Sequence, residues 1–128
     1  RQILEDLGAP EETREHVAEI VDNLSFRKGG DGSQLSLEGQ IVQDADRIDA
    51  LGAIGIVRTI EYGAALGQPF HRSGPSTDEA KTGIDHFHDK LFKLHDLMNT
   101  EPGRRLAADR EAFMRGFLDQ FLAECGEP

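Results

Sequence analysis

The sequence predicts an all-α fold, with five to six helices joined by two long loops rich in Gly and Pro. Apolar residues recur at the period of a helix along nearly the whole chain, and no segment alternates as a strand does. The two loops stand out as clusters of turn-forming residues at 27–34 and 67–82. The chain has 128 residues, which suits a single domain with a small core.

Each expected helix has a local signal. The expected spans are residues 1–7, 10–24, 37–52, 53–66, 83–98 and 102–124. Pro10 suits the first position of its helix, and Ser36 can cap the third one. Gly55 and Gly63 weaken the fourth helix without ending it.

Two helices have apolar stripes that predict their buried faces. For the third helix the stripe is Leu37, Ile41, Ala45 and Ile48. For the last helix the residues expected to face inward are Leu106, Phe113, Phe117, Leu118 and Phe121.

Charge and cysteine content narrow the classes of function. With 24 acidic and 14 basic residues the formal net charge is -10, which repels nucleic acid duplexes and anionic membrane surfaces. A small anionic substrate held through a cation fits this balance better. The single Cys125 can form no internal disulfide, and no apolar run is long enough to span a membrane, so we expect a cytoplasmic protein.

Three aspartates lie in the otherwise apolar third helix, namely Asp44, Asp46 and Asp49. Carboxylates in such a setting need a partner, and a metal ion is one candidate. On a helical wheel Asp44 and Asp49 flank the apolar stripe and Asp46 lies farther round, so geometry does not select a ligand. Pairing with Arg47 or Arg58, capping of loops, or simple solvation are the alternatives.

The segment 43–58, QDADRIDALGAIGIVR, resembles the closing motif of the HD-domain metal-dependent phosphohydrolases, in particular the YpgQ/YedJ-type bacterial subgroup. Residues 19–26, 37–42 and 84–100 resemble further blocks of that subgroup. The resemblance covers nearly the whole chain. It implies that residues 1–128 form the C-terminal part of an HD-type phosphohydrolase domain.

The resemblance assigns roles to the aspartate motif. Asp46, between Ala45 and Arg47, matches the metal-ligating aspartate of the superfamily and is therefore the expected metal ligand and catalytic residue. Arg47 matches a basic position that contacts substrate phosphates, although a structural ion pair is equally compatible. Asp44 and Asp49 are expected to support ligands or helix ends. The remaining family ligands, a histidine and a His-Asp doublet, are expected upstream of Arg1.

The downstream block supplies candidate substrate contacts. His86 matches a His-Phe pair of the subgroup and is expected either to line the cleft or to pack against the core. Lys90 and Lys93 share a helix face from which they can reach a substrate phosphate. Solvated pairing with Asp89 and Asp96 is the alternative reading.

Three other histidines are weaker candidates. The doublets His88-Asp89 and His95-Asp96 follow the aspartate motif, where the family order has no metal ligands. His16 stands alone on the second helix, where a surface or interface role is the more common one.

The function implied by the resemblance is metal-dependent hydrolysis of phosphoester or phosphoanhydride bonds in nucleotides, with a metal-activated water. Histidine and carboxylate ligands favour Mn²⁺, with Fe, Co, Ni, Zn or Mg as alternatives. The expected partner is a small-molecule nucleotide or phosphate ester. A catalytically inert helical module for regulation or dimerisation is the alternative function, and a homodimer is left open.

Overall fold

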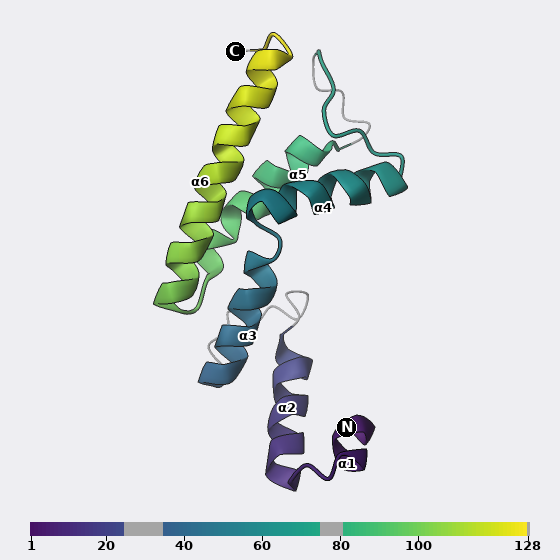
Figure 1. The fold of residues 1–128 in the computed structure, drawn as a ribbon, viewed down its shortest axis with the longest axis vertical. Coiled ribbons are helices and arrows are strands. Elements are labelled where there is room, and N and C mark those ends of the chain that lie inside the picture. Colours follow the sequence, from purple (N-terminus) through teal and green to yellow (C-terminus); the bar gives the residue numbers. More distant parts are fainter. Residues whose placement is uncertain (25–34, 75–80, 128) are drawn as a thin grey trace. The chain divides into compact units, whose positions relative to one another are not determined.

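The computed structural model describes residues 1–24, 35–74 and 81–127. It divides into two compact units, residues 1–43 and 44–128, and each is described here by itself. Every regular element in the described residues is helical and none is a strand, which confirms the all-α prediction (Figure 1). None of the described helices is both long and apolar enough to cross a membrane.

The regular elements of the described residues are six α-helices and two short 3-10 helices. Their bounds are α1 Gln2–Asp6, α2 Glu11–Asn23, α3 Leu37–Ile48, α4 Gly52–Ala65, α5 Gly83–Asp89, η2 Leu91–Lys93, η3 His95–Leu97 and α6 Glu101–Glu124. The expected loop 27–34 lies outside the described residues, as does the end of the block 19–26. The described parts of loop 67–82 contain no regular element, as predicted.

The N-terminal unit contains α1, α2 and most of α3. Pro10 is the N-cap of α2 rather than its first residue. The predicted cap at Ser36 is confirmed, because its Oγ accepts a hydrogen bond from Gly39 N at 3.2 Å. The same hydroxyl lies 2.8 Å from His16 Nε2, which gives this lone histidine a structural partner.

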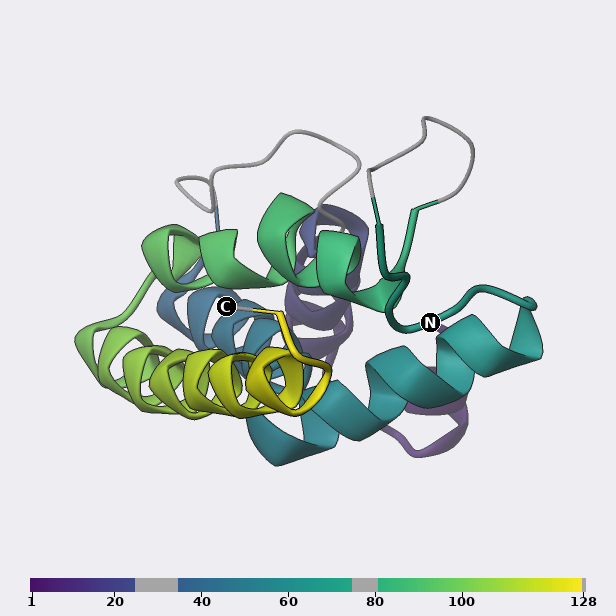
Figure 2. The ribbon, with the colours of Figure 1, turned by 90° about the horizontal axis from the view of Figure 1, so that it is seen from above.

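In the C-terminal unit, α4 packs against α5 and α6, and η3 packs against α6 (Figures 1 and 2). The core has its largest fully buried side chains at Leu51, Phe87 and Met114. Phe70, from the segment after α4, makes an edge contact with Phe87 at 5.7 Å between ring centroids. A Cβ at Gly83 would lie 2.5 Å from the Phe70 ring, so only glycine fits at the start of α5.

The predicted helix 83–98 was wrong beyond Asp89. A capping box between Thr82 and Asp85 starts α5, but Lys90 adopts φ -132° and ψ -56°, which ends it. The chain continues as the 3-10 helices η2 and η3. This break lets the adjacent residues Leu91 and Phe92 both enter the core, whereas neighbours on an α-helix diverge by about 100°.

The predicted buried stripe of α3 was also wrong, except at Ile48. Leu37 and Ile41 are 64% and 53% exposed, and Ala45 is exposed. The buried positions of α3 are instead Gly39, Gln43, Asp44, Arg47 and Ile48. The period was helical as expected, but the buried side is polar, because its charged groups find hydrogen-bond partners in the segment before α6.

On α6 the inward face was only partly predicted. Leu118 is buried, and Phe117 and Phe121 are partly buried, whereas Leu106 and Phe113 are exposed. The other buried positions of this helix are Gly103, Ala107 and Met114. Small residues at the first two positions allow the helix to approach its neighbours closely, which a stripe of large apolar residues does not reveal.

The carboxylate of Asp44, 3% exposed, joins the second half of α3 to the start of α6. Its Oδ1 accepts hydrogen bonds from the backbone N and Nδ2 of Asn99, at 2.8 and 3.0 Å. Its Oδ2 accepts from the backbone N and Oγ1 of Thr100, at 2.8 and 2.7 Å. Thr100 Oγ1 in turn accepts from Gly103 N, so the N-cap of α6 is held by Asp44.

Two arginines strengthen the same junction. Arg47 is buried and its guanidinium donates a hydrogen bond to the carbonyl oxygen of Leu97. Arg110 of α6 donates to the carbonyl oxygen of Ile48 at 2.9 Å, which satisfies the C-terminal end of α3. The junction therefore has hydrogen bonds in both directions between α3 and the α6 region.

Replacing Asp44 with alanine is expected to lower the free energy of unfolding by about 2–4 kcal/mol, because four half-buried donors of Asn99 and Thr100 lose the buried carboxylate that accepts from them. Urea denaturation followed by circular dichroism measures this. Asp46→Ala is the matched control, since Asp46 is exposed and has no hydrogen bond or ion pair in the described residues, and it should change stability by less than about 0.5 kcal/mol. Equal effects of the two substitutions would contradict the role of Asp44.

Two glycines of α6 provide a second test. A Cβ at Gly103 would overlap the Asp44 carboxylate, whereas a Cβ at Gly116 would meet nothing within 4 Å. We expect Gly103→Ala to destabilise the protein by about 1–3 kcal/mol. Gly116→Ala should stabilise it by roughly 0.5–1 kcal/mol, because alanine is the better helix former. Thermal melts of both variants measure the difference, and a stabilising Gly103→Ala would be inconsistent with the described packing.

Candidate functional site

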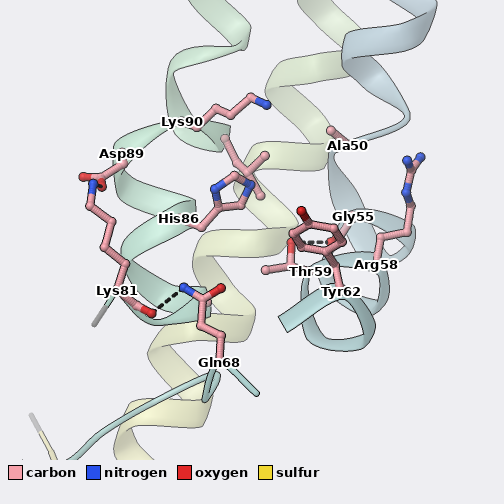
Figure 3. Close-up of a pocket in the computed structure, with 12 residues that line it drawn as sticks. Ala50, Gly55, Arg58, Thr59, Tyr62, Gln68, Lys81, His86, Asp89 and Lys90 are labelled. Carbon is pink, nitrogen blue, oxygen red and sulfur yellow. Dashed lines mark hydrogen bonds and ion pairs between the residues drawn. The ribbon is translucent and has the colours of Figure 1, made fainter. Parts of the chain in front are cut away.

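A cavity of about 410 Å³ opens in the C-terminal unit between α4, α5 and two residues that lie between these helices in the sequence, Gln68 and Lys81 (Figure 3). Its volume falls within the range of small-molecule sites. The lining residues are Ala50, Gly55, Arg58, Thr59, Tyr62, Gln68, Lys81, Gly83, His86, Asp89, Lys90 and Leu91.

Glycines set the shape of the α4 side of this pocket. A Cβ at Gly55 would overlap the carbonyl oxygen of Ala50, so the turn before α4 can close only against glycine. Thr59 Oγ1 donates to Gly55 O at 2.8 Å. At the other end of α4, Gly63 O accepts from Gln68 N at 2.8 Å, and this bond turns the chain back toward the pocket. The two glycines expected to weaken the helix instead permit close backbone contacts.

The capping box at the start of α5 sets the opposite wall. The Asp85 carboxylate accepts from Thr82 N at 2.8 Å, and these hydrogen bonds from Thr82 lower the pKa of Asp85. The helix that begins here carries His86 and Lys90, which are one helical turn apart. Figure 3 shows both side chains on the pocket side of the chain.

The pocket lining is rich in cations although the protein as a whole is acidic. It contains Arg58, Lys81 and Lys90 against the single carboxylate of Asp89. Lys81 Nζ pairs with Asp89 Oδ2 at 2.5 Å. This hydrogen-bonded pair raises the pKa of Lys81 and lowers the pKa of Asp89. The ammonium group of Lys90 forms no hydrogen bond or ion pair with any described residue, so its charge is available to an anion.

His86 lines the pocket together with Lys90, and its imidazole likewise forms no hydrogen bond within the described ranges. Burial lowers the pKa of its imidazole, and the nearby Lys90 lowers it further. The ring is therefore neutral at pH 7, with one nitrogen able to donate a hydrogen bond and the other able to accept one. Of the predicted substrate contacts, His86 and Lys90 come together in one pocket, whereas Lys93 on η2 is exposed and is not part of the lining.

The aspartate motif is divided between different environments. Asp44 is buried at the junction, where it orients the start of α6. Asp49 is exposed and pairs with Arg58, one of the partners expected for this motif. Burial lowers the pKa of Arg47, against the raising effect of the Asp44 and Asp46 charges. Its hydrogen bond is to Leu97, and a phosphate contact by Arg47 stays a prediction.

Asp46 is exposed, without a hydrogen bond or ion pair in the described part of the chain. It is free to serve as one metal ligand, and Ala50, one turn farther along, lines the pocket. Within the described ranges no group of three or more His, Cys, Asp or Glu residues is placed to hold a metal ion. These residues alone therefore do not fit a complete metal centre. That applies equally to the doublets His88-Asp89 and His95-Asp96.

Of the twelve lining residues, only His86 and Lys90 were predicted individually as site residues; the polar side chains that were not include Arg58, Thr59 and Tyr62. The loop 67–82 was expected to contribute to the mouth of the pocket, and it supplies Gln68 and Lys81. A sequence signal existed for part of this set. Gly55, Arg58, Thr59 and Tyr62 follow the spacing of one helix face, and their polar character breaks the apolar pattern of α4. Gln68 and Lys81 come from either side of the loop, and only the folded chain brings them together.

Comparison with known proteins finds relatives both by sequence and by structure. No family model matches the chain. It is 38% identical over 115 residues to YpgQ of Bacillus subtilis strain 168, a protein described as uncharacterized; the match covers 88% of this chain and 53% of YpgQ. A crystal structure of B. subtilis YpgQ matches with a TM-score of 0.85 at 36% identity, over 96% of this chain and 62% of that one.

Two further solved structures add to this result. B. subtilis YpgQ in complex with ADP matches with a TM-score of 0.80 at 34% identity, over 96% of this chain and 58% of that one. An HD-superfamily hydrolase from Bacillus thuringiensis matches with a TM-score of 0.78 at 38% identity, over 99% of this chain and 61% of that one. The chain thus spans between half and two thirds of the length of these relatives. Over that span, its homologues are YpgQ of B. subtilis and an HD-superfamily hydrolase of B. thuringiensis.

Proposed function

We propose that this chain is part of a metal-dependent phosphohydrolase that cleaves phosphoester or phosphoanhydride bonds of nucleotides. The pocket beside α4 and α5 carries this proposal, because it presents unpaired His86 and Lys90 in a protein with a net charge of -10. A cluster of cations in such a background favours an anionic ligand. The complex of YpgQ with ADP supports a nucleotide as that ligand.

The pocket residues provide charge and hydrogen bonds suited to phosphate. Lys90 supplies an ammonium group, and the neutral imidazole of His86 donates one hydrogen bond to a phosphate oxygen. Arg58 is next to this wall, although its guanidinium is shared with Asp49. Together these groups bind and orient the phosphate chain.

Asp46 is the proposed metal ligand, with the other ligands outside the described residues. A divalent ion, Mn²⁺ in the first instance, would lower the pKa of a bound water and offset charge on the phosphoryl oxygens. The carboxylate of Asp46 is exposed and has no hydrogen bond or ion pair with the described residues, so it gives up no protein partner when it binds an ion. The domain assignment of residues 1–128 to the C-terminal part of an HD domain belongs to the same proposal.

An inert helical module is the competing function, and one observation favours it. Large apolar side chains are exposed on several helices, among them Ile41, Ile54 and Phe113. Such residues are suited to an interface with another protein segment. A homodimer formed through them stays a prediction.

The metal assignment can be tested with the full-length protein. We expect Asp46→Ala to reduce bound Mn²⁺, measured by elemental analysis. It should also lower nucleotide hydrolysis by about 100-fold or more, because the metal that activates the water loses a ligand. Asp119→Ala, an exposed aspartate of α6, is the control and should retain both. Equal metal content and activity in the two variants would refute the role of Asp46.

The proposed contact between Lys90 and the phosphates can be tested by comparing substitutions of two nearby lysines. Lys90→Gln is expected to raise KM for a nucleotide roughly 10-fold, the effect of removing one charge-assisted hydrogen bond. Lys93→Gln, three residues later but outside the pocket, should change KM by less than about 2-fold. Steady-state phosphate release measures both, and a larger effect at Lys93 would place the phosphates elsewhere.

A second readout of Lys90→Gln does not depend on turnover. Because Lys90 helps to lower the pKa of His86, its removal should raise the His86 pKa toward the ordinary value of about 6.5. Titration of the imidazole by proton NMR measures this. An unchanged His86 pKa in the variant would show that the two side chains do not interact.

A further inference from the structure

The two ends of the pocket differ in chemistry. Lys90 gives one end an unpaired positive charge (Figure 3), whereas the guanidinium of Arg58, also in the lining, is paired with Asp49. Tyr62 follows Arg58 by one turn of α4, about 6 Å along the helix, and Gln68 lies beyond it. The pocket therefore passes from a charged end to an end with an aromatic ring and a neutral amide.

The second end holds a lysine, but its charge is already compensated. Lys81 extends its ammonium group to Asp89, while its backbone carbonyl oxygen accepts a hydrogen bond from Gln68 Nε2. The lining at this end thus offers no unpaired cation within the described residues. An uncharged part of a ligand is favoured there over a second phosphate.

Gln68 is held so that it presents an acceptor to the cavity. Its Nε2 is used by the carbonyl of Lys81, and Figure 3 shows its Oε1 on the side toward Thr59 and Tyr62. No hydrogen bond to Oε1 comes from the described side chains of the lining. A ligand N–H at this position would satisfy it.

Tyr62 offers a free aromatic surface at the same end. Its side chain is 69% exposed, and it makes no ring stacking contact or hydrogen bond within the described chain. A planar ligand group can cover such a ring without displacing any protein contact. Stacking on an aromatic side chain is tolerant of the identity of a nucleobase.

We infer that Tyr62 and Gln68 form the nucleoside-binding end of this pocket. The Tyr62 ring stacks on the base, and Gln68 Oε1 accepts a hydrogen bond from an N–H on the edge of the base. Lys90 and His86 hold the phosphates at the other end. This assignment rests on the proposed nucleotide hydrolysis, and it identifies the residues that determine substrate preference.

The test compares nucleotides with inorganic tripolyphosphate, which has the phosphates but no nucleoside. In the full-length protein, Tyr62→Ala should raise KM for nucleoside triphosphates by about 5- to 100-fold and leave KM for tripolyphosphate within about 2-fold. Tyr62→Phe keeps the ring and should behave as the wild type. Glu61→Ala, the neighbouring exposed position outside the lining, is the control.

Gln68→Met tests the hydrogen bond separately. It removes the acceptor at similar size, and should change the ratios of kcat/KM among nucleotides with different bases by about 5-fold or more. Unchanged ratios in this variant would remove Gln68 from the assignment. Hydrolysis of tripolyphosphate should be unaffected.

The outcomes separate this inference from the proposed function. If Tyr62→Ala leaves KM for nucleotides unchanged while turnover continues, the nucleoside site is overturned and the hydrolase stands. If the wild type hydrolyses neither substrate but binds ADP in calorimetry, and Tyr62→Ala weakens that binding, the site stands and the hydrolase is overturned. A wild type that neither hydrolyses nor binds nucleotides overturns both.

Discussion

The buried carboxylate of Asp44 is the constraint on which the C-terminal unit depends. It accepts four hydrogen bonds from Asn99 and Thr100, and through Thr100 it sets the first turn of α6. A buried charge is tolerated only where its lone pairs are satisfied, so the position of residues 44–48 relative to the start of α6 is closely restricted. The same restriction fixes the direction of the Asp46 side chain, because residues two apart on a helix are separated by about 200° around its axis. Burial of Asp44 therefore leaves Asp46 in solvent, where it is free for a ligand.

Close backbone approach is the second constraint, and it shapes the pocket. Gly55 meets the carbonyl of Ala50, and Gly83 meets the ring of Phe70. The first contact closes the turn before α4, and the second packs the start of α5 against Phe70. The space that remains is lined by longer polar side chains, including Arg58, His86 and Lys90. A pocket with charged walls thus arises beside a core of ordinary apolar residues.

The sequence predicted the helical class, most helix bounds and the cap at Ser36, because these depend on local periodicity and capping. It failed on the buried faces of α3 and α6, since burial depends on partners distant in sequence. Asn99 and Thr100 make the polar side of α3 the inner one, and no local pattern near Asp44 indicates them. The break after Asp89 was missed for the same reason, because Leu91 and Phe92 are drawn inward by tertiary packing. Among the site residues, His86 and Lys90 were identified by family resemblance. Gln68 and Lys81 lie in a loop that was expected near the pocket, but the fold was needed to select these two side chains from it.

The charges in the pocket favour a bound anion over a pocket filled with water. Burial and the adjacent Lys90 both lower the pKa of His86, so the free pocket disfavours a second positive charge on the imidazole. A bound phosphate group would offset the charge of Lys90. The Lys81–Asp89 pair, in contrast, is compensated without any ligand and has no such need. The uncompensated positive charge is therefore at the Lys90 end of the pocket. This asymmetry favours one orientation of a ligand that has one charged and one uncharged end.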